Sequence, residues 1–389
     1  MYEIRPAGQT RSLAGIRLLV PLSKGNPSRS TQASPKDGFV AAPPVRVTQE
    51  LSHAAARRIV SQAGGDLDAA ARRLLASAPQ HGIDFSLAFA TVEPAALDAP
   101  VLTSHHGPLD GPRKSGQRLS PKQLRYAQVR QACLPVLGAG GTAMLFLSEP
   151  SASESNPELA AAERAACLVA CCEHLSTLPN RRVKIAQALP ELDEHWFDEA
   201  LRLAGFISVG TLSYMRQEPL VLMRGKRPAA PELPAGVTVR WLSDPSQSQG
   251  DADLLAALDA SYEKTLDCPE LCGLRDTADI LASHKSTGTL DPSLWMLVTL
   301  EGVPAGCVLL SRCPEQRAIE LVYLGLGQAL RGKGLSKLLL THAIAKARAQ
   351  TPGWSVTCAV DERNVPALRL YTGMGFSVFG RRRALVRPV

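Results

Sequence analysis

The chain has 389 residues, a length that is typical of two or three domains rather than one. Apolar residues make up 45% and charged residues 20%, and the mean hydropathy is −0.02. This composition belongs to a folded globular protein and excludes a disordered or fibrous one. Apolar runs such as Leu294–Leu300 have the length of a buried strand and fall far short of the roughly 18 residues that a membrane-spanning helix needs. We therefore expect no membrane association.

The net charge of +7 is concentrated at the C-terminal end of the chain. Residues 331–389 contain 11 lysines and arginines against 2 acidic residues, whereas the rest of the chain is close to neutral. A compact basic region attracts polyanions, so phosphate-bearing ligands and nucleic acids are both candidate partners. Nucleic acid is the weaker candidate, because only 5% of the residues are aromatic and no helix-turn-helix pattern is present.

The nine cysteines do not form the spacing of a disulfide framework or of a metal site. Most of them lie in apolar patterns that predict buried positions: Cys167, Cys171, Cys172, Cys307 and Cys358. Cys268 and Cys272 are separated by three residues, and no second pair of ligands accompanies them. We expect reduced thiols in a cytoplasmic protein, and no bound metal.

The first half of the chain divides into an extension and a predicted domain. Residues 1–47 are rich in Arg, Lys, Ser and Pro with little periodicity, so we expect them to be a flexible N-terminal extension. Residues 48–217 alternate between helix and strand patterns, and residues 218–235, with four prolines, are a predicted linker. Helices are predicted at 48–60, 67–75, 159–178 and 193–204, strands at 85–92, 141–148, 182–189 and 207–214, and an exposed loop at 104–121.

Residues 236–389 form a second predicted domain with a similar alternation. Strands are predicted at 237–241, 295–300, 304–311, 319–324, 355–359 and 377–382, and helices at 252–264, 277–285, 335–349 and 366–374. Such alternation, with short hairpins at one side, predicts an α/β (α+β) fold with a central mixed sheet flanked by helices.

A glycine-rich turn joins the predicted strand at 319–324 to the predicted helix at 335–349. Glycines in the turn Arg331-Gly-Lys-Gly334 let backbone N–H groups point inward and let a ligand approach closely. The start of the helix carries about half a positive charge, to which Arg331 and Lys333 add, so the turn predicts a pyrophosphate cradle. It is neither a P-loop nor a dinucleotide fingerprint. Taken alone, it is equally consistent with a turn that only packs the helix on the sheet.

Two segments resemble a known family. Arg331-Gly-Lys-Gly-Leu-Ser336 resembles the R/Q-x-x-G-x-G/A pyrophosphate loop of the GNAT superfamily of N-acetyltransferases. The segment Asn364-Val-Pro-Ala-Leu-Arg-Leu-Tyr371-Thr-Gly-Met-Gly-Phe376 is similar to its second signature, N-x-x-A-x-x-L-Y-x-x-x-G-F, in the family's order and spacing. Ser336 stands where glycine or alanine is usual, but serine is small and its hydroxyl can donate to a phosphate.

The resemblance implies acetyl-CoA as cosubstrate and assigns residues to it. Backbone groups at Leu324 and Leu326 would face the pantetheine arm, and Asn364 would contact the cofactor arm. The pyrophosphate would lie on the turn and the first helical residues: Arg331, Gly332, Lys333, Gly334, Leu335 and Ser336. Asn364 is equally well suited to cap the helix that follows it, and the two roles are compatible.

The resemblance also implies direct attack of an amine on the thioester, with no covalent nucleophile on the protein. Tyr371 occupies the family's general-acid position and would protonate the CoA thiolate; alternatively it is a core aromatic. Glu320 is the best candidate for the base that takes the amine proton. Strand alternation places Glu320 on one face with Val322 and Leu324, where it could instead be the partner of an arginine.

The acceptor side is less determined. In the GNAT superfamily the loop between the first two helices covers the acceptor, and here that loop is Tyr262–Leu274. Its carboxylates at Glu263, Asp267 and Glu270 would either attract an amine or be ordinary surface charges.

The first half repeats the rhythm of the second and ends in Ala200-Leu-Arg-Leu-Ala-Gly-Phe206, which echoes the segment around Tyr371. It has no R-x-x-G-x-G turn, and residues 149–158 contain three glutamates that would repel pyrophosphate. We therefore expect two GNAT-like domains in tandem: a degenerate copy at 48–217 that is structural or shapes the acceptor pocket, and an acetyl-CoA-binding copy at 236–389.

The expected function is an N-acetyltransferase that moves an acetyl group from acetyl-CoA to an amine acceptor. Two other functions are kept open: an inactive acyl-CoA-binding sensor or scaffold, and a nucleic-acid-binding module that uses the basic C-terminal region. The sequence leaves the acceptor amine, the acyl-chain length and the oligomeric state undetermined.

Overall fold

The computed structural model describes residues 11–13, 16–18, 41–62, 65–93, 128–152, 154–179, 182–219, 233–242 and 248–389. The predicted loop at 104–121, most of the predicted extension and most of the predicted linker lie outside these residues. Strands β1 (Arg11–Leu13) and β2 (Ile16–Leu18) pair with each other as a separate hairpin.

The two halves of the chain contain the same order of elements: strand, two helices, three strands, helix, strand, helix, strand. In the first half these are β3 (Val45–Arg46), α1 (Gln49–Ile59), α2 (Leu67–Ser77), β4 (Phe89–Val92), β5 (Val129–Gly138), β6 (Thr142–Leu147), α5 (Pro157–Ser176), β7 (Ile185–Ala188), α6 (Asp198–Leu203) and β8 (Ile207–Gln217). In the second they are β9 (Val237–Trp241), α7 (Ser248–Tyr262), α8 (Thr277–Ser286), β10 (Trp295–Leu300), β11 (Val303–Cys313), β12 (Ala318–Leu326), α9 (Leu335–Gln350), β13 (Ser355–Asp361), α10 (Val365–Gly373) and β14 (Ser377–Pro388).

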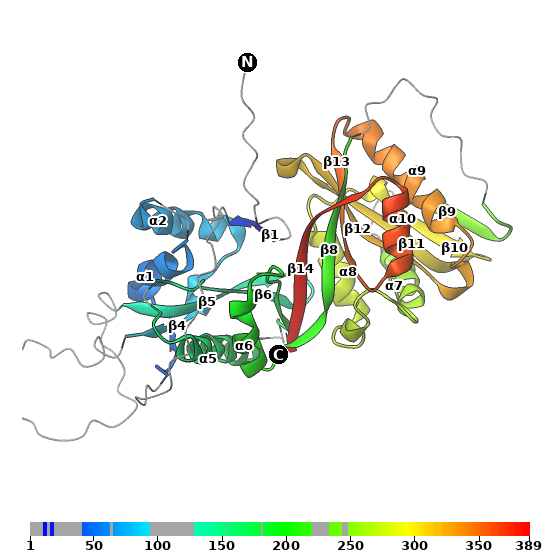
Figure 1. Cartoon of the computed structure of the whole chain (residues 1–389). Helices are drawn as coiled ribbons and strands as arrows, with labels where there is room; N and C mark the ends of the chain where they lie inside the picture. The colour runs from blue at the N-terminus through cyan, green and yellow to red at the C-terminus, as the bar shows by residue number, and fades with distance from the viewer. Residues whose placement is uncertain are drawn as a thin grey trace, which may run out of the picture.

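One mixed sheet runs through both halves in the order β3-β4-β5-β6-β7-β14-β8-β13-β12-β11-β10-β9. The pairs β6–β7 and β12–β13 are parallel, and the other pairs are antiparallel. This confirms the predicted α/β fold with a mixed sheet flanked by helices. The sheet also has a feature that the sequence did not predict. Strand β8 of the first half lies between β13 and β14, and strand β14 of the second half lies between β7 and β8 (Figure 1).

The exchanged strands carry core residues into the opposite half. Met215 of β8 is 1% exposed and packs in the core of the second half, whereas Leu385 of β14 packs against the core of the first half. Each half therefore depends on the other to complete its sheet and its hydrophobic core.

Helices cover both faces of the second half's sheet. On one face, α7 and α8 pack on β10 and β11 through Leu254, Leu258, Leu281, Trp295 and Leu309. On the other face, α9 and α10 pack on β11, β12 and β13, and Tyr371 belongs to that core. The four helices leave the end of β12, the start of α9 and part of β13 between them for a site.

Several elements differ from the predictions. Strand β5 was not predicted, and the predicted strand at 85–92 is a 3-10 turn at Phe85–Leu87 followed by β4. Residues 45–47, placed in the extension, belong to the sheet and core of the first half: Val47 is 2% exposed. Strand β14 continues six residues beyond the predicted end, and its three consecutive arginines pair with Glu362, Glu191 and Asp198.

The exchange of strands predicts that the halves stay together without a covalent link. We expect a chain cut at a protease site inserted within residues 220–232 to elute as one species in size-exclusion chromatography, because β8 keeps its partners β13 and β14. The same cut sample in urea provides the control, since there the fragments must separate. Two peaks in native buffer would contradict the prediction.

Candidate acyl-CoA site

Strands β12 and β13 pair at one end and separate at the other. Their parallel pairing joins Ala318–Glu320 to Ser355–Thr357 and then stops, although both strands continue. We call the opening between residues 321–326 of β12 and 358–361 of β13 the β12–β13 split. Backbone groups along the split have no partner across it, and they are the polar groups that an extended ligand can bind.

A β-bulge lies in β12 at the start of the split. Leu310 pairs with Leu321 and Leu309 with Tyr323, so Val322 has no partner on β11. The extra residue changes the alternation: Val322 packs under α7 and α8, whereas Leu324 packs toward α9 and α10. The expectation that Glu320, Val322 and Leu324 share a face is therefore wrong for Leu324.

The glycine-rich turn lies directly after the split and is exposed. Gly332 and Gly334 have φ angles of 73° and 74°, a region that glycine adopts without strain. Gly334 is the N-cap residue of α9 and has no side chain to cap it, so the first N–H groups of the helix remain available to an anion. Lys333 is exposed, Ser336 is half-buried, and Leu335 is buried in the core, so only its backbone can face a ligand.

Arg331 is part of the turn, but its guanidinium is occupied. Its three nitrogens donate to the backbone oxygens of Leu326 at 2.8 Å, Lys264 at 3.2 Å and Ser261 at 2.7 Å. Ser261 and Lys264 lie at the C-terminal end of α7, where helix carbonyls lack partners. Arg331 therefore ties the turn to α7 and β12, and its side chain is placed to position the turn rather than to bind a phosphate directly.

Tyr371 lies on α10 and is 7% exposed, packed against Phe376 with ring centroids 5.6 Å apart. Burial is the main cause that raises its pKa above the ordinary value near 10, and the nearby Cys358 and Asp267 act in the same direction. The phenol is thus protonated at neutral pH. Asn364 begins the helix and accepts a hydrogen bond from the Ala367 N–H at 3.3 Å, which confirms its predicted capping geometry.

Glu320 is the last residue of β12 that pairs with β13. Its carboxylate accepts a weak hydrogen bond from the Cys313 thiol at 3.6 Å, and burial raises its pKa above the ordinary value of 4.5. It interacts electrostatically with Cys358, the first residue of β13 beyond the pairing, and Cys358 in turn interacts with Tyr371. Ile319 and Leu321 belong to the core that contains Tyr371, so Glu320, which lies between them in the strand, projects from the opposite face of the sheet.

The loop between α7 and α8 reaches into this region through Asp267. The Asp267 carboxylate accepts hydrogen bonds from the Asp361 N–H at 2.9 Å and from the side chain of Asn364. Burial of the carboxyl group is the main cause that raises the pKa of Asp267, although the residue as a whole is exposed. Of the three acidic residues predicted on this loop, Asp267 lies at the split, Glu270 pairs with Arg363, and Glu263 accepts from Gln328 beside the turn.

A buried carboxylate that the sequence analysis did not identify holds the loop in place. Asp361, at the end of β13, is fully buried and accepts from the Cys268 N–H at 3.1 Å and from Arg363. Burial opposes its ionisation, but the hydrogen bonds from Arg363 and Cys268 outweigh burial and lower its pKa. Arg363 also donates to the Val209 oxygen of β8, so this cluster joins the loop, β13 and the first half.

The first half contacts α8 and the loop before it at two further places. Leu271 and Leu274 of the loop pack on Val209, Ile185 and Ala384, which lie on β8, β7 and β14. The turn between β5 and β6 docks on α8, where a Cβ on Gly140 would overlap the Asp279 backbone. Lys184 binds Asp276 and Asp279 there, each at 2.6 Å.

A column of polar side chains behind β12 was also not predicted. The Tyr323 hydroxyl and the Ser261 hydroxyl are 2.7 Å apart, and His284 stacks on the Tyr323 ring at 5.3 Å. Burial lowers the pKa of His284 to about 4, so the imidazole is neutral at pH 7. The bulge at Val322 places Tyr323 in this column, since it turns Tyr323 toward α8.

The comparisons with known proteins agree with this geometry. Residues 259–376 match the family model described as the acetyltransferase (GNAT) family, a segment that contains the split, the turn and Tyr371. This match lies wholly within the second half of the chain. The chain is 32% identical over 178 residues to a mycothiol acetyltransferase of Frankia casuarinae, covering 41% of this chain and 49% of that protein. It is 35% identical over 88 residues to the peptidyl-lysine N-acetyltransferase YjaB of Salmonella typhimurium, covering 23% of this chain and 52% of that protein.

The chain thus spans about half the length of the curated relatives it matches. Among solved structures, a GCN5-related N-acetyltransferase from Sphaerobacter thermophilus matches with a TM-score of 0.46 and 14% identity, over 87% of this chain and 90% of that one. A tandem GNAT protein from the clavulanic acid biosynthesis pathway matches with a TM-score of 0.42 and 15% identity, over 68% and 80%.

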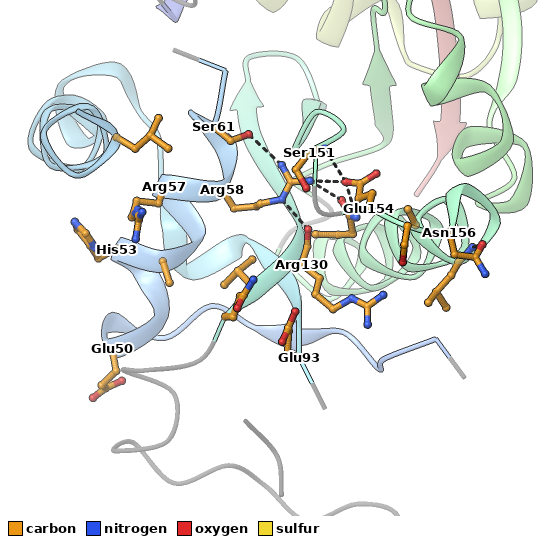
Figure 2. Close-up of a pocket in the computed structure, with 18 of the residues that line it drawn as sticks. Glu50, His53, Arg57, Arg58, Ser61, Glu93, Arg130, Ser151, Glu154 and Asn156 are labelled. Carbon is orange, nitrogen blue, oxygen red and sulfur yellow. Dashed lines mark hydrogen bonds and ion pairs between the residues drawn. The ribbon is translucent and has the colours of Figure 1, made fainter. Parts of the chain in front are cut away.

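The first half has a hollow of about 1280 Å³ between α1, β5 and the start of α5 (Figure 2). Figure 2 shows Arg58 and Glu154 facing each other there, and their charged atoms are 2.7 Å apart. Arg164 binds the same Glu154 oxygen at 2.7 Å. Asn156 caps α5 by accepting from the Leu159 N–H, so that helix start is not open to an anion.

This network changes the predicted role of the glutamates at 149–158. Burial opposes ionisation of Glu154, but hydrogen bonds from Arg164 and Gln131 lower its pKa. Arg58 and Arg164 neutralise Glu154, so Glu154 would repel a phosphate less than predicted. Because both arginines already bind Glu154, their charges are occupied, and this is the stronger reason against a phosphate site in the first half.

No helix in the described part of the chain is long and apolar enough to cross a membrane. Within the same residues, no three His, Cys, Asp or Glu side chains form a group that could hold a metal ion. None of the nine cysteines forms a disulfide, and Cys268 is buried whereas Cys272 is exposed.

We predict that Asp361→Ala destabilises the protein by about 3 kcal/mol at pH 7, because it leaves the Cys268 N–H and part of Arg363 without their partner. A carboxyl with a lowered folded-state pKa stabilises above its unfolded pKa, so the difference from wild type should shrink as the pH falls below about 4. Urea unfolding at both pH values measures this. Glu199→Gln, which alters an exposed pair on α6, is the control and should leave the midpoint nearly unchanged. Equal midpoints for Asp361→Ala and wild type at pH 7 would contradict the prediction.

Proposed function

We propose that the chain transfers an acetyl group from acetyl-CoA to an amine. The observation that carries the proposal is the β12–β13 split, which ends at an exposed glycine turn and an uncapped helix start. The extended arm of an acyl thioester can bind to unpaired backbone groups, and a pyrophosphate can bind to N–H groups that point toward it. The split offers the first, and the turn and helix start that follow it offer the second. The two curated relatives are named as acetyltransferases, one of them acting on peptidyl-lysine, which supports an amine acceptor.

In this proposal the cofactor lies along β12 toward α9. The backbone at Leu324 and Leu326 binds the pantetheine arm. The pyrophosphate lies on the N–H groups of the turn and of Leu335 and Ser336, with Lys333 adding charge. Arg331 holds the turn in place, and Asn364 positions the start of α10 and the Asp267 carboxylate. The thioester carbonyl then lies at the split, where a backbone N–H near Leu326 polarises it.

The acceptor nitrogen attacks the carbonyl carbon directly, and the carbon–sulfur bond breaks as the amide forms. Glu320 takes the proton that the nitrogen loses, and Tyr371 gives a proton to the departing thiolate. Tyr371 suits the acid role because burial keeps its phenol protonated, and Glu320 suits the base role because burial raises its pKa toward neutrality.

We further propose that residues 48–217 and 236–389 are tandem copies, with residues 218–235 as the linker, in a cytoplasmic protein. The first copy has no glycine turn, and its helix start is capped by Asn156, so it binds no pyrophosphate in this way. In this proposal the first copy contributes β8 to the shared sheet. It also holds the acceptor side in place, through Val209, which binds Arg363, and through Lys184, which binds Asp276 at the start of α8.

Calorimetric titration tests the cofactor site. We expect acetyl-CoA to bind the wild type at one molecule per chain, because only the second half has the open turn. Arg331→Gln should weaken binding about tenfold at any salt concentration, since it loosens the turn. Lys333→Gln should weaken binding mainly at low salt, since its contribution is a screened charge. Arg72→Gln on α2 is the control for loss of an exposed arginine. No binding to the folded wild type would overturn the proposed function.

Steady-state kinetics test the two catalytic residues. We expect Tyr371→Phe and Glu320→Gln each to lower kcat by roughly 10²–10⁴. The wild-type kcat should rise with pH through a pKa above 4.5, as Glu320 loses its proton, and this acidic limb should be absent in Glu320→Gln but kept in Tyr371→Phe. An acidic limb that persists in Glu320→Gln would remove Glu320 from the base role.

A further inference from the structure

The sheet face that carries Glu320 is open where it crosses the exchanged strands. On the opposite face, Cys358 and Met215 are buried beneath α9 and α10. On this face Ala359 is exposed, although it lies in the middle of β13 with strands on both sides. An exposed alanine in a central strand means that the face is left uncovered at that point.

A row of polar side chains crosses this open face. Glu320 pairs with Thr357, Thr357 with Arg216, and Arg216 with Ser377, so the four side chains project from the same face of four adjacent strands. Neighbouring strands are about 4.8 Å apart, which places the backbones of Glu320 and Arg216 about 10 Å apart. The part of this row from Glu320 to Arg216 thus has a carboxylate at one end and a guanidinium at the other, with the split beside the carboxylate.

Aromatic rings flank the cationic end. The Arg216 guanidinium lies over the Phe379 ring at 4.7 Å, and Tyr214 packs edge-on against the same ring at 6.3 Å. Phe379 is 47% exposed. The two rings lie beside Arg216 on β8 and β14, and β13 lies between them and Glu320.

The charge of Arg216 is less engaged than that of its neighbours. Its ion pair with Glu218 is 3.9 Å long, and both side chains are exposed. By contrast, Arg363, Arg381 and Arg382 hold carboxylates at 2.6–2.9 Å. Arg216 is therefore the arginine on this face with the most capacity to bind a further anion.

We propose that the acceptor is an amine that also bears a carboxylate, and that Arg216 is its specificity-determining residue. The ammonium group lies at Glu320, the carbon skeleton crosses β13 at Thr357, and the carboxylate binds Arg216. This inference rests on the proposed transferase function and adds the substrate class to it. Since Arg216 belongs to β8, the first half of the chain supplies the selectivity of the second half's reaction.

The test compares ω-amino acids of increasing length, from glycine to 6-aminohexanoate, with the n-alkylamines that lack the carboxylate. CoA release from acetyl-CoA gives kcat/KM for each in wild type, Arg216→Gln and Arg216→Glu. We expect wild type to prefer the longer amino acids over the matched alkylamines at least about tenfold, with glycine too short to span the row. A glycyl dipeptide and its C-terminal amide give the same contrast for a peptide acceptor.

In Arg216→Gln the preference should fall to within about threefold, and Arg216→Glu should invert it in favour of diamines. Arg72→Gln is the matched control, because that arginine is also exposed in a 3.9 Å ion pair, on α2. Transfer to amines without a carboxylate preference, or a preference that survives in Arg216→Gln, overturns this inference and leaves the transferase function standing. Acetyl-CoA binding without transfer to any amine overturns both.

Discussion

The exchange of the last strands between the two halves is the constraint on which the rest of the structure depends. Strand β8 of the first half lies between β13 and β14 of the second half and pairs with both. It carries Met215 into the core of the second half. Beyond its pairing with β12, strand β13 stays paired with β8 as far as Asp361, so it remains part of the sheet where it borders the split. A strand of the first half thus pairs with the edge of β13 that a further strand of the second half would otherwise cover. The geometry of the site therefore depends on both halves of the chain.

The distribution of charge follows from the same arrangement. The basic C-terminal region looks in the sequence like a surface for a polyanion, yet four of its eight arginines bind carboxylates in the fold. Arg382 and Arg383 hold Glu191 and Asp198 of the first half, and Arg363 holds Asp361 and the acceptor loop. Lys333 at the turn remains exposed and can face a ligand. The net charge of a segment therefore overstates its binding capacity where folding brings acidic residues to it.

Much of the second half could be predicted because its signals are local. The glycines of the turn, the cap at Asn364 and the 3.6-residue period of α9 are short-range features, and the two motifs fixed their order. The features that were not predicted depend on contacts between residues far apart in the sequence. The place of β8 between β13 and β14, the burial of Asp361 and the tie from Arg331 to Ser261 each join segments at least 70 residues apart. The bulge at Val322 also escapes a pattern of alternation, because a single extra residue reverses the face of all that follow.

Burial at the split raises the pKa of both Tyr371 and Glu320, and the raised pKa suits them to opposite roles in proton transfer. A tyrosine ordinarily loses its proton near pH 10, so a raised pKa keeps Tyr371 able to donate. A glutamate ordinarily loses its proton near pH 4, so a raised pKa makes Glu320 a stronger base while it can still ionise. Asp267 has a raised pKa as well, but it is held by the Asp361 N–H and by Asn364, and those hydrogen bonds occupy its oxygens. The Glu320 carboxylate accepts only from a thiol, a weak donor, among the contacts described here. Under the proposed function this difference assigns proton transfer to Glu320 and the positioning of the loop to Asp267.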